Sequence, residues 1–270
     1  MKILYTKSNW EVNALPLEEF LTRTKKDGFD GTEIDLRTLN KPADEVIDLH
    51  NKYGLKYVAQ LITEGKTIND HINDLKEKAR FAVECKPILI NTHVGKDFFT
   101  FDENLKIFQE LLSLTKESGI QFVAETHRGR PTYSAIETKG YLDVLPELLL
   151  AADFSHWMVV HESDLSGQQK NVHAAIERSR HIHARVGYEQ GPQVTDPSAP
   201  EWTEHLENHI GLWQKIVECN KAAGREFFTI TPEFGPPNYM HTLPFSNKPV
   251  SDTWEMNLKM KKILQERLMV

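Results

Sequence analysis

The sequence of 270 residues has little of what marks disulfide-rich and membrane proteins. Its two cysteines, Cys85 and Cys219, belong to no CxxC pair or regular spacing, so both are expected to be reduced, structural thiols. No apolar run approaches the roughly 18 residues of a membrane span. The first residues, MKILYTKSNW, lead into a strand-like pattern and not into a signal peptide. We therefore expect a cytoplasmic protein without a membrane partner.

An excess of positive charge is also missing, because 32 lysines and arginines face 39 acidic residues and the formal net charge is −7. Surfaces that bind duplex nucleic acid are usually basic, so a nucleic-acid partner is not expected, although a local basic groove stays open. We find no linker and no low-complexity segment. The length is near the roughly 250 residues of an eight-fold β/α barrel. These features predict a single domain over residues 1–270.

Short apolar runs alternate with longer segments of helical period along the chain. Strands are predicted at 3–5, 32–36, 56–62, 88–93, 122–126, 148–154, 181–186 and 227–231. Helices are predicted at 17–26, 44–53, 68–83, 105–117, 136–145, 172–178, 202–223 and 256–268. Eight such units predict the α/β class and a closed (β/α)₈ barrel, the TIM barrel. Two long loops, 187–200 and the extended C-terminal loop 235–251, precede the last two helices, and loops this long are usually functional or disordered.

Polar residues occupy strand positions that face the barrel lumen. The predicted strand 181–186 has one apolar face and one polar face, which consists of His181, His183 and Arg185. The same alternation places one acidic residue near the carboxyl end of each of three other strands. These acidic residues are Glu125, Asp153 and Glu233. Together with His183 they form a candidate set of four ligands.

These four side chains can converge because neighbouring strands lie about 4.8 Å apart. Taken singly, a glutamate at a strand end is more often solvated, and a lumen histidine is more often a hydrogen-bonded core residue. Three buried carboxylates together would repel one another, and a divalent cation removes that cost. The oxygen and imidazole donors suit Mn²⁺, Zn²⁺, Co²⁺ or Mg²⁺. The sequence thus predicts one divalent metal ion at the mouth where barrel enzymes carry their chemistry.

Four short motifs in chain order resemble the xylose-isomerase-like TIM barrel superfamily, and in particular its sugar phosphate isomerase/epimerase family. They are FVAETH around Glu125, DFSHW with Asp153 and His156, HIH with His183, and TPEFG with Glu233. The resemblance spans nearly the whole chain. Two segments depart from the family pattern: the loop 187–200, and GPPNYM after the last motif.

The resemblance implies a metal-dependent isomerase or epimerase of a small sugar or sugar derivative. Glu125 and Glu233 would bind the metal and also move protons on opposite sides of the substrate, through a metal-stabilised enediolate. His156 would contact the substrate or a metal-bound water. Arg185 would neutralise developing charge or hold a carboxylate or phosphate of the substrate.

Two further histidines are candidate substrate contacts at the mouth. His93 ends the fourth predicted strand, where it could equally be a hydrogen-bonded wall residue. His127 follows the fifth strand together with Arg128 and Arg130, a cluster that suits an anionic group or, equally, a solvated loop.

Three alternatives to a sugar isomerase stay open: an inosose-type polyol dehydratase, an endonuclease IV-like metallohydrolase, and a non-catalytic sugar-binding barrel. The dehydratase would begin with the same proton abstraction beside a carbonyl. The sequence does not identify the sugar, its phosphorylation or the native metal, and it leaves open whether the chain forms a homo-oligomer.

Overall fold

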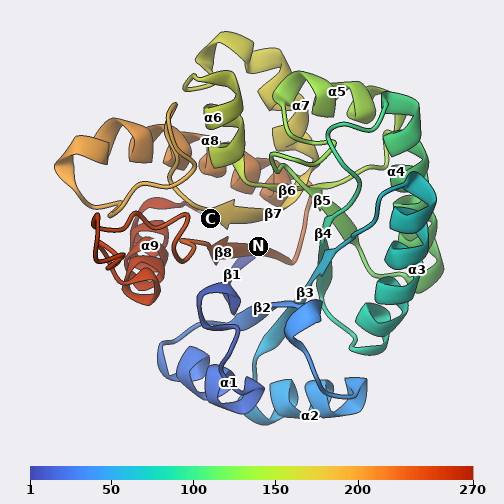
Figure 1. Cartoon of the computed structure of the whole chain (residues 1–270), viewed down its shortest axis with the longest axis horizontal. Helices are drawn as coiled ribbons and strands as arrows, with labels where there is room; N and C mark the ends of the chain where they lie inside the picture. The colour runs from blue at the N-terminus through green and yellow to red at the C-terminus, as the bar shows by residue number, and fades with distance from the viewer. Residues whose placement is uncertain (270) are drawn as a thin grey trace.

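Eight parallel strands close into a barrel in chain order in the computed structural model, which describes residues 1–269 (Figure 1). The strands are β1 (Lys2–Ser8), β2 (Gly31–Asp35), β3 (Lys56–Ile62), β4 (Leu89–His93), β5 (Phe122–Glu125), β6 (Leu150–Ala152), β7 (Ser179–Ala184) and β8 (Phe227–Pro232). Closure is made by β8 on β1, where Lys2 pairs with Phe227 and Tyr5 with Ile230. The predicted (β/α)₈ barrel is confirmed.

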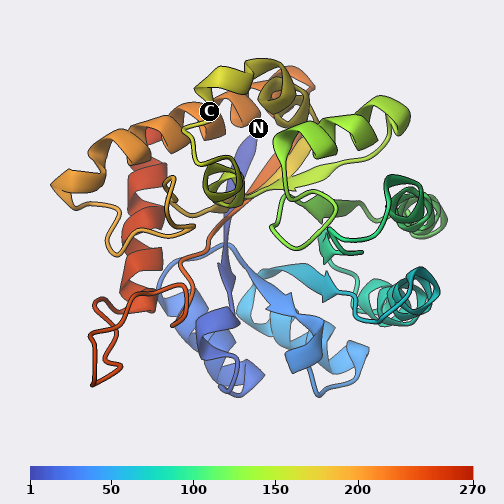
Figure 2. The same cartoon turned by 45° about the horizontal axis from the view of Figure 1, so that its top comes forward.

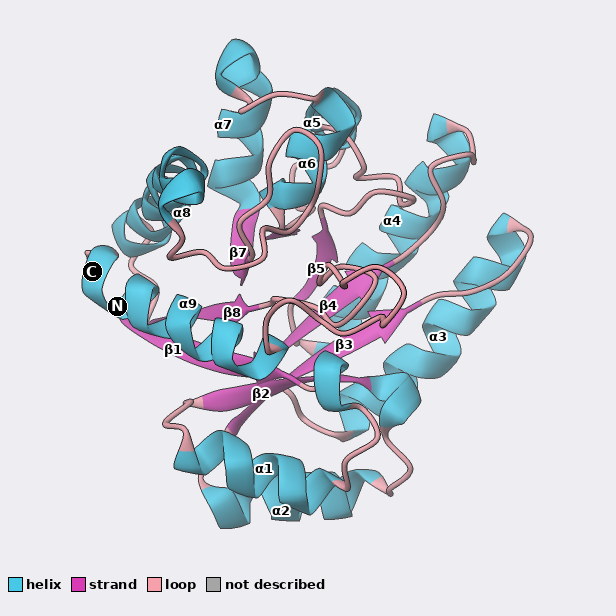
Figure 3. Ribbon diagram, turned by 60° about the vertical axis from the view of Figure 1, so that its left-hand side comes forward, coloured by secondary structure: helices cyan, strands magenta, loops and turns pink. Residues whose placement is uncertain are grey.

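Helices surround this barrel on the outside, as Figures 2 and 3 show from two directions. They are α1 (Leu17–Lys26), α2 (Ala43–Tyr53), α3 (Ile68–Glu84), α4 (Phe101–Ser118), α5 (Ala135–Val144), α6 (Phe154–His161), α7 (Gln169–Arg178), α8 (Thr203–Ala222) and α9 (Thr253–Arg267). Among residues 1–269, no helix has both the length and the apolar character that crossing a membrane requires.

The sixth unit differs from its prediction. The strand predicted at 148–154 is confined to Leu150–Ala152, and the helix α6 begins directly after Asp153, which caps it through Ser155. Helix α6 has the sequence FSHWMVVH, and its first five residues are all buried. Such a helix carries no amphipathic period, so its pattern does not distinguish it from a buried strand.

Two other helices begin earlier than predicted because of their caps. Helix α4 starts at Phe101 and not at 105, since Thr100 forms a capping box with Glu103. Helix α9 starts at Thr253 and not at 256, since the side chain of Asp252 accepts a hydrogen bond from the backbone of Glu255.

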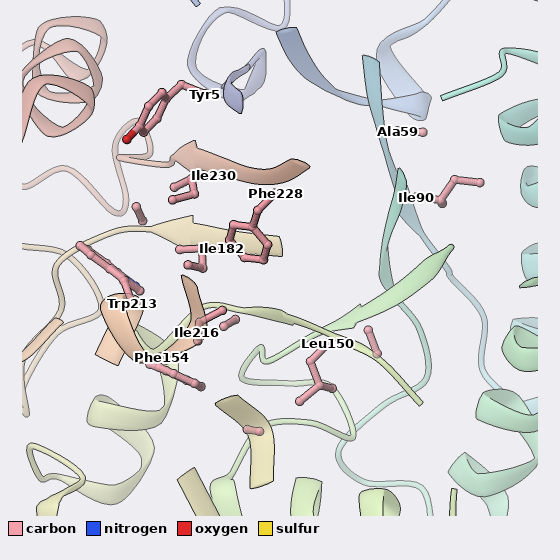
Figure 4. Packing of buried hydrophobic residues seen from close by; sticks show 14 of the residues in the cluster. Tyr5, Ala59, Ile90, Leu150, Phe154, Ile182, Trp213, Ile216, Phe228 and Ile230 are labelled. Carbon is pink, nitrogen blue, oxygen red and sulfur yellow. The ribbon is translucent and has the colours of Figure 1, made fainter. Parts of the chain in front are cut away.

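Apolar side chains cover the outer face of the barrel and fill one end of its lumen. On the outside, Ile182 and Ile230 are paired residues of β7 and β8, and they belong to the same buried cluster as Trp213 and Ile216 of α8 (Figure 4). Inside, a second and smaller cluster consists of Val58, Leu89, Val123 and Ala151. This inner cluster lies toward the amino ends of its strands, so the other end of the lumen is left for polar side chains.

Hydrogen bonds join the loop 187–200 to helix α8 and to the loop 235–251. The backbone N–H of Gly187 donates to Nε2 of the buried His209 in α8, at 2.9 Å. The buried side chain of Gln193 accepts from the N–H of Gly235 at 2.6 Å and donates to its carbonyl at 3.1 Å. One amide side chain thus joins the loop 187–200 to the loop 235–251.

The buried His209 makes stability depend on pH, because burial lowers its pKa to about 3. In the unfolded chain a histidine has a pKa of about 6.5. Between these values the unfolded state binds a proton that the folded state does not. The free energy of unfolding therefore falls as the pH drops from about 6.5 toward 3.

We expect His209→Gln to make this pH dependence shallower, since glutamine can still accept from Gly187 but does not titrate. Urea unfolding across this pH range, with a chelator present, measures the slope. His173→Gln is the control, because the side chain of His173 is 67% exposed. If the free energy of unfolding changed equally steeply with pH in wild type and in His209→Gln, the assignment of this pH dependence to His209 would be contradicted.

Candidate metal centre and its cavity

The structure brings the four predicted ligands to one place. One ligand atom from each of Glu125, Asp153, His183 and Glu233 lies within 4.8 Å of the others, and all four residues are buried. Glu125 ends β5, His183 lies in β7, and Asp153 and Glu233 directly follow β6 and β8. The convergence follows from the period of two in each strand, which points every second side chain into the lumen.

His183 is oriented so that one ring nitrogen faces the carboxylates. Its Nε2 lies 2.9 and 3.0 Å from the two oxygens of Glu33. Its Nδ1 lies 2.9 Å from Oε2 of Glu233 and 3.2 Å from Oε2 of Glu125, without a hydrogen bond of acceptable geometry. Burial would lower the pKa of His183, but Glu125, Glu233 and Glu33 raise it well above its usual value, so the metal-free ring carries a proton on Nδ1 as well. A divalent ion would displace that proton while Glu33 still accepts from Nε2. A buried nitrogen in that position fits a metal ligand.

Glu33 is the important residue that the candidate set omitted. It is 1% exposed, and it also contacts Nε2 of His181 at 3.1 Å and accepts from the hydroxyl of Thr231 at 2.6 Å. Burial alone would raise the pKa of Glu33, but the charges and hydrogen bonds of His183 and His181 hold it well below its usual value. Its signal in the sequence is the alternation that places Glu33 and Asp35 on one face of β2.

Arg185 lies against the centre and is the positive charge beside its carboxylates. Its guanidinium contacts Asp153, and its Nη1 lies 3.6 Å from Oε2 of Glu233. Burial disfavours the charge of Arg185, but Asp153 and Glu233 raise its pKa above the usual value. Burial raises the pKa of Asp153 to about 6, against the opposing effect of Arg185. Two of the buried carboxylates, Asp153 and Glu233, therefore lie against one fixed cation.

A cavity of about 250 Å³ opens onto this centre. Its walls include Glu125 and Glu233, whereas Asp153 and His183 do not line it. The other residues that line it are Trp10, Asp35, Arg37, Gln60, Ile62, His93, His127, Arg130, Arg185 and Tyr239. The two glutamates are thus the only residues of the four-membered set that face the space a substrate would occupy.

The predicted substrate contacts divide into two groups. His93, His127 and Arg185 line the cavity. His156 does not line it, is fully buried, and lies with Nε2 at 3.0 Å from Arg185. Burial lowers the pKa of His127 to about 3, and that of His156 also falls well below its usual value, so both rings are neutral. The structure gives His156 a position behind Arg185 instead of on the cavity wall.

The two arginines after β5 are engaged by the protein. Arg130 lines the cavity and donates through Nη1 to the carbonyl oxygens of Gly95 at 2.9 Å and Thr63 at 3.2 Å. The guanidinium carbon of Arg128 lies 4.9 Å from the ring centre of Tyr239. Neither arginine is a freely solvated loop residue.

Comparison with proteins of known structure gives the class of fold. A D-psicose 3-epimerase matches with a TM-score of 0.66 and 11% identity, over 98% of this chain and 99% of that one. A sugar phosphate isomerase/epimerase from Parabacteroides distasonis matches with a TM-score of 0.63 and 13% identity, over 98% and 93% of the two chains. The (β/α)₈ barrel expected from the sequence is confirmed, and its fold is similar to the folds of these two proteins over nearly the whole chain.

The same fold carries other chemistry. An AP endonuclease, family 2, from Brucella melitensis matches with a TM-score of 0.65 and 12% identity, over 98% of this chain and 99% of that one. No family model and no curated protein matches the sequence. The function must therefore be argued from the site.

Trp10 and Tyr239 form an aromatic wall of the cavity, with ring centres 4.9 Å apart at an interplanar angle of 80°. Gly235 makes room for this wall, since an added Cβ there would lie 2.3 Å from Cζ3 of Trp10. We expect Gly235→Ala to displace Trp10 and to destabilise the fold by about 1–3 kcal/mol.

Acrylamide quenching measures this displacement, with a Trp10→Phe variant to isolate the contribution of Trp10. The quenching of Trp10 fluorescence by acrylamide should rise in Gly235→Ala. Gly211→Ala is the matched control, because a Cβ on Gly211 in α8 meets nothing within 4 Å. Unchanged shielding of Trp10 in Gly235→Ala would contradict the packing argument.

Proposed function

We propose that this chain is a cytoplasmic enzyme that uses a divalent metal ion to isomerise or epimerise a small sugar or sugar derivative. One observation carries the proposal. Two glutamates of a buried four-ligand set, Glu125 and Glu233, line a small cavity. The other two members, Asp153 and His183, do not line it. That arrangement supplies two proton-transfer groups at one metal centre.

The donor set suits the cation. Glu125, Asp153, His183 and Glu233 would hold it with three carboxylates and one imidazole, which fits Mn²⁺, Zn²⁺, Co²⁺ or Mg²⁺. When bound, a divalent ion supplies Lewis-acid stabilisation of the negative charge that develops on substrate oxygens. Glu33 would keep Nδ1 of His183 directed at the ion, as partners behind a ligand histidine do.

The chain's own groups perform the proton transfers. Burial would raise the pKa of Glu125, but the charges of His183 and His93 hold it well below its usual value, so this residue is a carboxylate able to accept a proton. One glutamate removes a proton from the carbon beside the substrate carbonyl. The other returns a proton to the opposite face in an epimerase, or to the neighbouring atom in an isomerase. Arg185 holds Asp153 in place and brings positive charge to the cavity wall.

The cavity favours a monosaccharide over a polymer. Its volume of about 250 Å³ is below the roughly 300–1,000 Å³ of pockets for drug-sized ligands. Trp10 and Tyr239 offer flat surfaces for C–H groups, and His93, His127 and Gln60 offer polar atoms for hydroxyl groups. The net charge of −7 disfavours the endonuclease alternative.

The metal can be tested without knowing the substrate. Protein purified without chelator should contain a divalent ion, and Asp153→Asn/His183→Ala should lower the content by about one ion per chain, since metal affinity depends on these ligands. Elemental analysis measures it. A variant with two exposed substitutions, Glu84→Gln/His173→Ala, should keep the wild-type content. Wild-type protein that neither contains nor takes up Mn²⁺, Co²⁺ or Zn²⁺ would sink the proposal.

The chemistry can be tested with ketoses, their phosphates and inososes in deuterated water. The wild type should incorporate deuterium at the carbon beside the carbonyl. Glu233→Gln should lower turnover by about 10²–10⁴-fold, the usual worth of a general acid or base. The control is Glu226→Gln, an exposed residue before the other end of β8. Wild-type turnover in Glu233→Gln would refute the two-glutamate account, and loss of water from the product would indicate a dehydratase.

A further inference from the structure

A second cavity lies at the opposite end of the barrel from the metal centre. Its volume is about 210 Å³. Residues at the amino ends of four strands line it, among them Ile88 before β4, Gln121 before β5, Arg180 in β7 and Phe227 in β8. Leu89 also lines it and belongs to the inner apolar cluster that fills this end of the lumen. The residues that line it are all different from those of the cavity at the metal centre.

Two arginines line this second cavity without a carboxylate partner. Neither Arg180 nor Arg225 is in an ion pair with a carboxylate in the part of the chain that the structure describes. Burial lowers the pKa of both, that of Arg180 to about 10, and the charge of Arg225 lowers the pKa of Arg180 further. Both groups stay charged at neutral pH, so they repel each other. A negative charge bound beside them would remove this repulsion.

The hydrogen-bond donors of the two arginines are only partly used. Nη1 of Arg180 donates to the carbonyl oxygens of Glu177 at 3.0 Å and Ser179 at 2.9 Å, which fixes the guanidinium at the carboxyl end of α7. Nε of Arg180 and Nε of Arg225 are buried, and neither has a hydrogen-bond partner within residues 1–269. A buried donor without a partner is costly, and more so on a charged group. Guanidinium groups bind the oxygens of phosphate and carboxylate groups in pairs, which would satisfy these donors.

We propose that Arg180 and Arg225 bind a phosphate group at the amino end of the barrel. A phosphate group carries a charge of about −1.5 to −2 at pH 7, which matches the two guanidinium groups. It also accepts several hydrogen bonds at once. Gln121, which lines the same cavity, has an amide able to donate one more. The site takes no part in the proton transfers proposed above, which lie at the other end of the strands.

The cavity has room for more than the phosphate group. A water molecule takes up roughly 30 Å³ in the liquid, so a phosphate group leaves part of the 210 Å³ free. Phe227, which is 41% exposed, offers apolar surface at the same cavity. One lining residue is acidic, Glu226, and its side chain is exposed and paired with neither arginine. The occupant is therefore either the free phosphate ion or the phosphate group of a small metabolite.

Isothermal titration calorimetry on full-length protein stripped of metal by a chelator tests the proposal, with inorganic phosphate and glycerol phosphate as the two probes. We expect one saturable site per chain. Arg180→Gln and Arg225→Gln should each weaken binding by about 10–100-fold, the usual worth of a hydrogen bond to a charged group. Arg80→Gln is the matched control, since it removes an exposed positive charge on α3, and it should keep the wild-type affinity. Tighter binding of glycerol phosphate would support a phosphorylated metabolite as the occupant, and tighter binding of inorganic phosphate would support the free ion.

Thermal unfolding separates phosphate binding from a purely structural role of the arginines. Without phosphate, Arg225→Gln should unfold at the same Tm as the wild type or a higher one, because the substitution removes a repulsion. Phosphate should raise the Tm of the wild type more than that of the variant, because only binding to the folded state stabilises it.

Two outcomes of the titrations would overturn the proposal. Phosphate binding of wild-type strength in folded Arg180→Gln and Arg225→Gln would place the anion elsewhere on the chain. An affinity for phosphate no higher than that for chloride would show that the cavity does not recognise the oxygens of a phosphate group. The metal content of the protein enters neither outcome, so both leave the proposed function standing.

Discussion

The repulsion among buried carboxylates at the carboxyl end of the barrel is the constraint around which this structure is built. Glu33, Glu125, Asp153 and Glu233 are buried at this end of the lumen, and each ionised group there is costly unless it is paired. His183 reaches three of the four with its two ring nitrogens, and Arg185 holds the fourth. The arrangement is stable because every carboxylate has a cationic or hydrogen-bonding neighbour, and two of the carboxylates still face the cavity.

The strand alternation made much of this predictable. A period of two in a buried strand allows each lumen residue to be named from the sequence, so the meeting of Glu125, His183 and Glu233 follows from the order of residues alone. Glu33 obeys the same alternation in β2, but its importance comes from a contact with β7, and the sequence separation of 150 residues conceals that contact. The wrong prediction is local: the first five residues of α6 are all buried, and a helix that is buried all round shows no amphipathic period in its sequence.

The fold narrows the function without deciding it. Sugar-converting enzymes and an endonuclease share this barrel at 11–13% identity, so the arrangement of strands tolerates several reactions at the same mouth. The function of this chain is constrained by the composition of its small cavity, which has two glutamates, two hydrogen-bonded imidazoles, an aromatic wall, and arginines that the protein already holds in place. His156, which the motif predicts to contact the substrate, hydrogen-bonds Arg185 and does not line the cavity. Its contact with the substrate stays a prediction. A motif gives the identity of a side chain, but the packing around that side chain decides whether it faces the cavity.

The hydrogen bonds of the Gln193 amide limit how this barrel can change in evolution or by engineering. Because one buried side chain satisfies both the N–H and the carbonyl of Gly235, the middle of the loop 187–200 is joined to the start of the loop 235–251. Replacing the loop 187–200 alone would leave both backbone groups of Gly235 without partners in the interior, and a different start of the loop 235–251 would leave the amide of Gln193 without its partners. The two loops on this scaffold are therefore expected to change together, as one inherited or transplanted module, and not one at a time while the other stays fixed.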